Sequence, residues 1–175
     1  MADEKMIYDL EGGRMPYSTE AEQAVLGSLI IDPGSFTLVA SILKADHFYL
    51  PQHKEIYAML SKMFELNQSV DYISLLEKLK QTPNYDEAKG KAYIAHLIEV
   101  VPSAANILSY ANIVRERYYA RSLTRVAQEI IKDVSDNNQD ANKLIESAEQ
   151  RIYEIRQGKE VSGLTHIKDV IEAQT

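Results

Sequence analysis

The feature that most constrains the fold is the segment 104–134, which contains neither glycine nor proline. Apolar side chains recur in it every three or four residues, which is the spacing of one face of an α-helix. Such a segment predicts a single helix about 45 Å long at 1.5 Å per residue. The apolar positions are Ile107, Ala111, Val114, Tyr118, Leu123, Val126, Ile130 and Val134.

A second helix is predicted over 141–156, after the polar run 135–140. Asp140 is a suitable N-cap, and Gly158 is expected to end the helix. Its apolar face carries Leu144, Ile145, Ala148, Ile152 and Ile155. Because six polar residues can join only neighbouring antiparallel helices, segment 103–158 is predicted to form a helical hairpin.

The apolar faces of these two helices are too broad to be buried by packing the two helices against each other. The hairpin must therefore fold back onto the rest of the chain or pair with the same faces of another copy, and we favour pairing. The residues expected to pair between subunits are Tyr118, Leu123, Val126, Ile130, Leu144, Ile145 and Ile152.

The segment 18–102 is predicted to be a globular head of short helices, so the fold class is all-α. Ser18 or Thr19 caps the first helix, which runs to about Ile30. Further helices are expected over 33–43, over 52–66, after Asp71 and over 91–100, with Lys89 and Gly90 in a connection. Phe48, Tyr49, Ile56 and Tyr57 are expected in the core, and His53 is expected to make an internal hydrogen bond.

The two ends of the chain differ from the rest. Residues 1–17 are predicted to be a flexible N-terminal arm, and 159–175 a linker with the start of a linker helix. Ile167, Val170 and Ile171 form the apolar side of that short helix and are candidates for docking on another domain. The abrupt end of this helix suggests a piece of a longer protein.

Composition excludes several classes of function. The sequence has no cysteine, which removes disulfides, thiolate catalysis and cysteine-based metal sites. Four scattered histidines leave little for another metal site, so no metal is expected. We find no apolar run near 18 residues and no signal peptide, and a cytoplasmic location is expected. A net charge of −7 disfavours binding of nucleic acid by bulk electrostatics.

Motifs for catalysis and for nucleotide binding are absent from the sequence. It contains no Gly-x-x-x-x-Gly-Lys-Ser/Thr, Gly-x-Gly-x-x-Gly, His-Glu-x-x-His or Gly-x-Ser-x-Gly string. Pairs of carboxylates, such as Glu20 with Glu22 and Asp86 with Glu87, are interpreted as first-turn charges and solvated loop. No catalytic residue, cofactor or enzyme activity is therefore expected of this segment.

Arginines are concentrated on the long helix. Arg115 precedes a stripe with helical spacing, formed by Arg117, Arg121 and Arg125. This stripe can contact phosphate or an acidic partner, or it can be a solvated face in which Arg125 pairs with Glu129. We favour the solvated face.

Three strings resemble signatures of the bacterial replicative DNA helicases, the DnaB family. They are the run 16–27 followed by Asp32-Pro33, the run 46–57 that opens with Asp46-His47-Phe48-Tyr49, and the run 101–114 that opens with Val101-Pro102-Ser103-Ala104-Ala105-Asn106. Together they cover residues 16–157 in the family's order, and 159–175 resembles its linker.

The resemblance implies the N-terminal domain of such a helicase. In the family a helical head carries a hairpin, hairpins pair between subunits, and the domains form a collar, a trimer of dimers, above a ring of ATPase domains. The resemblance further implies docking of the primase C-terminal domain on the collar, contact of the linker helix with a neighbouring ATPase domain, and a possible contact with a helicase loader. ATP and magnesium are implied only for the ATPase domain, whose Walker motifs are not in this sequence.

Some of the matched residues have clear structural roles. Gly27 suggests a close approach of two helices, since a glycine inside a helix costs about 1 kcal/mol relative to alanine. Asn106 is interpreted as a capping or joint residue between head and hairpin. The resemblance thus implies an assembly and primase-docking domain, and a single-stranded DNA-binding module that uses the arginine stripe is the alternative.

Overall fold

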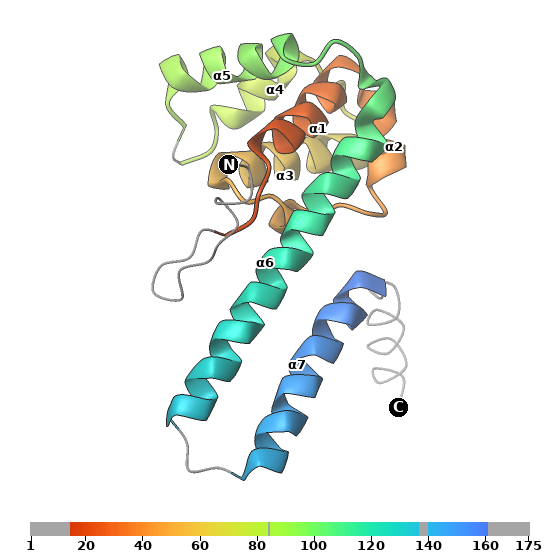
Figure 1. Ribbon diagram of the computed structural model, residues 1–175. Coiled ribbons are helices and arrows are strands. Elements are labelled where there is room, and N and C mark those ends of the chain that lie inside the picture. Colours follow the sequence, from red (N-terminus) through yellow and green to blue (C-terminus); the bar gives the residue numbers. More distant parts are fainter. Residues whose placement is uncertain (1–14, 84, 137–139, 161–175) are drawn as a thin grey trace, which may run out of the picture. The chain divides into compact units, whose positions relative to one another are not determined.

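A computed structural model describes residues 15–83, 85–136 and 140–160 (Figure 1). Every element in these described ranges is a helix. The chain divides into two compact units, one of which is Pro16–Tyr118 and will be called the head. The second contains Tyr119–Thr175, and its described part will be called the hairpin unit. The division lies inside one continuous helix, α6.

Helix α1, Thr19–Ile31, forms the centre of the head. Its N-cap is Ser18, whose hydroxyl accepts a hydrogen bond from the backbone N–H of Ala21 at 3.1 Å, as the sequence predicts. The helix ends before Pro33, which cannot continue it because proline lacks an N–H. Eight of its thirteen residues are buried, so α1 is enclosed on more than one side.

The helix predicted over 33–43 is shorter in the structure. A 3-10 turn, η2 (Pro33–Ser35), leads into α2, which spans only Phe36–Val39. Tighter backbone hydrogen bonds follow, in which the N–H groups of Ile42 and Leu43 both donate to the carbonyl of Val39. This turn brings Leu43 into the core, where it is 3% exposed. A second 3-10 turn, η3, covers Ala45–His47.

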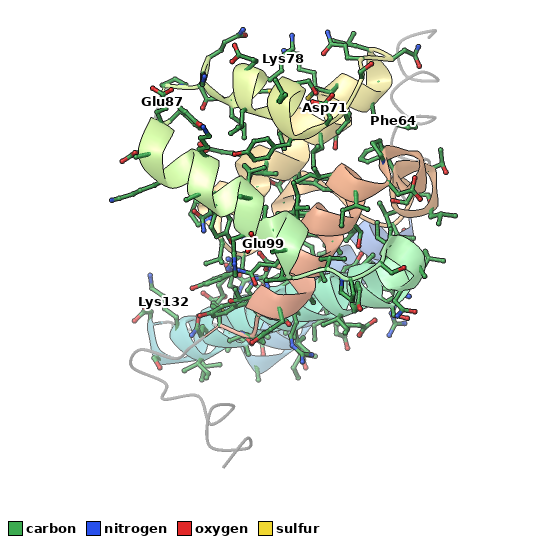
Figure 2. All side chains as sticks on the ribbon, turned by 90° about the horizontal axis from the view of Figure 1, so that it is seen from above. Phe64, Asp71, Lys78, Glu87, Glu99 and Lys132 are labelled. Atoms are coloured by element: carbon green, nitrogen blue, oxygen red, sulfur yellow. The ribbon has the colours of Figure 1, made fainter. Side chains whose placement is uncertain are left out.

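Helices α3 (Pro51–Glu65) and α5 (Glu87–Glu99) pack against α1, and α4 (Tyr72–Leu79) packs against α3 and α5. The cap predicted at Asp71 is confirmed, because its carboxylate accepts the N–H of Ser74 at 2.7 Å. Asp71, Lys78 and Glu87 lie on the outer rim of α4 and α5 in Figure 2. Asn67, which follows α3, has a φ of 53°, a left-handed conformation that asparagine tolerates after a helix.

The predicted start of α5 is wrong by four residues. The carboxylate of Asp86 accepts the N–H groups of Ala88 and Lys89 at 3.1 and 3.2 Å, and this cap starts the helix ahead of Gly90. Gly90 therefore lies inside α5 rather than in a connection. It leaves room for the ring of Tyr85, because a Cβ at Gly90 would meet the Tyr85 Cζ at 2.9 Å.

Gly27 confirms the predicted close approach of two helices. A Cβ built at this position would overlap the carbonyl oxygen of Leu97 and lie 2.7 Å from Cγ2 of Val101. The α1 and α5 backbones can therefore touch only because position 27 has no side chain. One apolar core surrounds this contact, with Phe48, Ile56 and Tyr57 buried as predicted and Tyr49 half-buried.

The segment without glycine and proline folds as predicted. A 3-10 turn, η4 (Ala104–Asn106), is capped by the Ser103 hydroxyl and leads into α6 (Ile107–Asp136). The second helix of the hairpin, α7, spans Ala141–Glu160. Asp140 accepts the N–H of Asn142 at 3.2 Å, which agrees with its predicted capping role.

The predicted end of α7 is wrong, because Gly158 lies inside the helix. Its surroundings are open, with no atom of another element within 4 Å of where a Cβ would stand, so no packing against its neighbours forces a break. A glycine there costs only about 1 kcal/mol relative to alanine, which the helix tolerates. The candidate docking residues Ile167, Val170 and Ile171 lie outside the described residues.

Candidate interface on the helical hairpin

Charged side chains fix the alignment of the two helices of the hairpin unit. Arg151 on α7 donates to Asp133 on α6, with 2.7 Å between Nη2 and Oδ2, and its Nη1 lies 3.5 Å from Oε2 of Glu129. Asp133 and Glu129 are one turn apart, so a single arginine spans two turns of the facing helix. These pairs are 28–59% exposed and contribute little to stability, but they specify the register.

Both helices of the hairpin unit also carry large apolar side chains that are exposed to solvent. These side chains are between 43% and 57% exposed in the single chain. At 3.6 residues per turn, the three positions on each helix fall within about 100° of one another around its axis, which places them on a common face. We call this surface the exposed stripe; it consists of Leu123, Ile131 and Val134 on α6 and Ile145, Ile152 and Tyr153 on α7.

The predicted pairing residues fall into two groups. Leu123, Ile145 and Ile152 belong to the exposed stripe and can contact a partner directly. The other four are wholly or partly covered within the chain: Tyr118, Val126, Ile130 and Leu144. Val126 is only 9% exposed, and the ring of Tyr118 contacts the ring of His47 with 4.5 Å between centroids.

Half of the exposed stripe is not among the residues predicted from sequence. Ile131 and Tyr153 each come one residue after an apolar residue of the predicted face, so they fall outside its helical spacing. Val134 belongs to the predicted apolar pattern but not to the predicted pairing residues, although it lies eleven residues, or about three turns, from Leu123. All three can be assigned to the stripe once the exposed positions of each helix are known from the structure.

The arginine stripe is not presented to solvent as a row. Arg121 is 2% exposed, Arg117 is half-buried, and only Arg125 is exposed. Arg115 donates to the side-chain oxygen of Asn112 at 3.1 Å. The expected partner of Arg125, Glu129, makes its ion pair with Arg151. The burial of Arg121, at the centre of the stripe, argues against a row of arginines that binds phosphate. The DNA-binding alternative depends on such a row.

Inside the head, Glu22 holds together three segments. Glu22 lies in the first turn of α1, as interpreted from the sequence, but its carboxylate is only 1% exposed and makes contacts that the first-turn position does not predict. Oε2 accepts the N–H of Tyr49 at 2.9 Å, and Oε1 accepts the N–H of Leu50 at 3.3 Å, so an α1 side chain caps the start of α3. Oε1 also lies 2.8 Å from Nδ1 of His53.

The network continues from His53 to α5. The Nε2 atom of His53 is hydrogen-bonded to the hydroxyl of Tyr93, which confirms the predicted internal bond, and Gln23 donates to the same hydroxyl at 3.2 Å. Burial raises the pKa of Tyr93, and the nearby charge of Glu22 raises it further. The network therefore links α1, α3 and α5 through the side chains of Glu22, Gln23, His53 and Tyr93.

Two kinds of site are absent from the described residues. They contain no group of three or more His, Asp or Glu side chains placed to hold a metal ion. No single described helix is long and apolar enough to cross a membrane; only the bent pair of α5 with residues 104–136 passes on length and composition.

Comparison with known proteins places this hairpin and head in a family. The family model described as the DnaB-like helicase N terminal domain matches residues 14–116, more than half of the chain. The chain belongs to the DnaB-like helicase N-terminal domain family. It has the all-helical fold of that family and shares 25% identity with the N-terminal domain of DnaB helicase from Mycobacterium tuberculosis, whose crystal structure it matches with a TM-score of 0.73 over 81% of this chain and 99% of that one.

Full-length relatives are replicative DNA helicases. The chain is 35% identical over 164 residues to the replicative DNA helicase DnaC of Bacillus subtilis, covering 93% of this chain and 36% of that protein. It is 32% identical to DnaB of Geobacillus stearothermophilus, covering 89% and 34%. A solved DnaB-like replicative helicase, described with its interactions with primase, matches with a TM-score of 0.63 and 26% identity, covering 89% of this chain and 35% of that one. The chain thus spans about a third of the length of these relatives.

Proposed function

We propose that this chain is the assembly and partner-docking part of a hexameric replicative DNA helicase. In this proposal hairpins pair between subunits to build a collar, and primase binds the collar through its C-terminal domain. The exposed stripe is the observation that carries the pairing, because six large apolar side chains of the hairpin are 43–57% exposed in the single chain. The named interaction of a structural relative with primase supports the docking.

The proposal also includes partners and a cofactor that lie outside this chain. An ATPase motor that uses ATP and magnesium would belong to a part of the helicase beyond this chain, which itself would hold no cofactor and catalyse no reaction. Residues 167–171 would contact the ATPase domain of an adjacent subunit, and a helicase loader would be a further partner. The protein would act at the replication fork in the cytoplasm, with any contact to DNA weak or indirect.

Substitution in the exposed stripe tests the pairing. Ile152 is 43% exposed, so Ile152→Glu should leave the fold of a single chain intact. In a paired hairpin the same glutamate would be buried without a partner at a cost of several kcal/mol. We therefore expect the dimer Kd to rise by at least about 100-fold.

The measurement is light scattering after size exclusion over a concentration series. Lys143→Glu, also exposed on α7 but on the opposite side of the helix from Ile152, is the matched control and should pair as the unmodified chain does. Adding the cognate primase C-terminal domain should increase the mass of the unmodified dimer. If Ile152→Glu leaves the mass unchanged, the stripe is not the pairing surface; if the unmodified chain stays monomeric and ignores primase, the proposal fails.

A further inference from the structure

The head contains a pocket for which the proposed function gives no occupant. It has a volume of about 270 Å³ and lies between the start of α3, the end of α4 and the first half of α5, whose first and last residues, Glu87 and Glu99, are labelled in Figure 2. The volume is below that of typical sites for drug-sized ligands, which are roughly 300–1,000 Å³, and suits one long side chain. The apolar part of the lining is formed by Ile56, Leu79, Tyr85, Tyr93 and Ile94.

Both aromatic walls of this pocket are held in place. Tyr93 is fixed by its hydrogen bonds to His53 and Gln23. The ring of Tyr85 lies over Gly90, where a Cβ would stand 2.9 Å from the Tyr85 Cζ. Aromatic rings attract a guanidinium group that lies within about 6 Å of them, and aliphatic walls pack against the methylene stem that carries it. The pocket is therefore preformed for a side chain with an apolar stem and a cationic end.

The polar groups of the lining offer an occupant mainly acceptors. The Thr82 hydroxyl already donates its proton to the carbonyl of Leu79 at 2.6 Å, so it can only accept further hydrogen bonds. Asp86 caps α5 through Oδ1 alone, and Glu55 makes no hydrogen bond or ion pair with any described residue. The Tyr85 hydroxyl is buried and likewise lacks a partner among the described residues, which is costly. An arginine, with five N–H donors and no acceptor, matches this set of groups.

The charges at the pocket also favour a cation. Two carboxylates, those of Glu55 and Asp86, line it against one ammonium group, that of Lys89. Lys89 is exposed, and its flexible four-carbon stem lets the ammonium group move into solvent. The other lysine near Tyr85, Lys80, is already paired with a carboxylate of its own helix at 3.2 Å. An acidic occupant would instead meet two like charges for each opposite one.

We propose that this pocket binds the side chain of an arginine carried by a partner protein. The methylene stem packs against the aliphatic walls, and the guanidinium group donates to the Glu55 carboxylate and the Tyr85 hydroxyl. An arginine within a chain is favoured over the free amino acid because its peptide bonds remove the carboxylate that would face Glu55 and Asp86. Every lining residue belongs to the head, so this contact requires no pairing of hairpins.

The test is a titration of the full 175-residue chain, followed by the methyl resonances of Ile56, Leu79 and Ile94. The probe is N-acetyl-arginine amide. The matched probe is N-acetyl-citrulline amide, which has the same length but carries a neutral urea in place of the guanidinium group. We expect the arginine probe to shift these resonances with a Kd of about 1–10 mM, as suits a single side chain. The citrulline probe should bind at least about tenfold more weakly, because it loses the charge-assisted hydrogen bonds.

Variants of exposed residues test the assigned contacts. Glu55→Gln should raise the Kd of the arginine probe at least about fivefold. Glu65→Gln, an exposed change at the end of the same helix and away from the pocket, should leave the Kd unchanged. Lys89→Gln should leave the Kd unchanged or lower it, because it removes a like charge.

Four results would overturn the proposal. They are unchanged resonances with the arginine probe, equal affinities for the arginine and citrulline probes, an effect of Glu55→Gln no larger than that of Glu65→Gln, and weaker binding after Lys89→Gln, which would indicate an anionic occupant. Free L-arginine provides the last comparison. If it binds as tightly as the amide, the pocket belongs to the amino acid itself, and the assignment to a partner protein is wrong.

Discussion

Gly27 offers the sharpest test of how the head is packed. Gly27→Ala places a methyl group against the carbonyl oxygen of Leu97 and 2.7 Å from Cγ2 of Val101. The first of these neighbours is backbone of α5, which cannot rotate away, so the two helices must separate. Overpacking of this kind costs about 1–3 kcal/mol, and overlap with backbone belongs to the upper part of that range.

The substitution also brings a gain. Alanine is about 1 kcal/mol better than glycine inside a helix, so the net loss of unfolding free energy should be about 1–2 kcal/mol. The head contains about 100 residues, for which a loss of 1 kcal/mol lowers Tm by about 4–8 °C. We expect Tm to fall by roughly 5–15 °C, measured by circular dichroism and checked by urea denaturation at constant m.

Gly158→Ala is the matched control, because it is the same change in a helix with no atom of another element within 4 Å of the new methyl group. It should leave stability unchanged or raise it by up to about 1 kcal/mol. The reasoning is refuted if Gly27→Ala stabilises the chain as much as Gly158→Ala does, since helix propensity alone would then account for both results.

Two further predictions concern buried polar groups. Glu22→Gln replaces one carboxylate oxygen by an NH2 group, which then faces His53 or one of the backbone N–H groups that now donate to Glu22. The substitution should lower the free energy of unfolding by about 1–3 kcal/mol in urea denaturation, while Glu20→Gln, an exposed change on the same helix, should lower it by less than about 1 kcal/mol. Equal losses would contradict the assigned network. Burial raises the pKa of Tyr57 to about 12, so stability is fully present below pH 10 and is lost as pH rises from 10 to 12, by about 1.4 kcal/mol per pH unit for this residue. Tyr57→Phe loses the hydrogen bond to the carbonyl of Leu43, about 1 kcal/mol at neutral pH, and should show a shallower alkaline decline in urea denaturation at pH 9, 10 and 11; an unchanged slope would contradict the raised pKa.

Local signals in the sequence predict much of the fold. Ser18 and Asp71 cap helices because their side chains reach N–H groups three residues away, and the segment 104–134 is helical because no glycine or proline in it interrupts the backbone. The prediction at Gly27 is correct because a glycine inside an apolar helix loses helix propensity and gains only room for a neighbouring backbone. The same local rule fails at Gly90 and Gly158, which it treats as breaks, since neither needs a positive φ.

The features that the sequence does not predict depend on partners distant along the chain. Glu22 is bound to groups 27 to 31 residues away, so its first-turn position gives no sign that it is buried. Arg121 has the spacing of a solvated stripe, and only the folded chain shows it to be covered. The exposed stripe is predictable in part because its apolar periodicity is local, but which face stays open depends on how α6 and α7 align.

The Glu22 network also limits the routes by which this sequence can evolve. Replacing the carboxylate alone strands the N–H groups of Tyr49 and Leu50 and leaves His53 without its acceptor, and replacing His53 alone leaves a buried charge with one fewer donor. Apolar residues at positions 22, 53 and 93 together would not remove this cost, because the backbone N–H groups of Tyr49 and Leu50 would still lack an acceptor. An acceptor at position 22 is therefore expected to persist among relatives of this chain. His53 and Tyr93 bond to each other, and their replacement is expected to occur jointly.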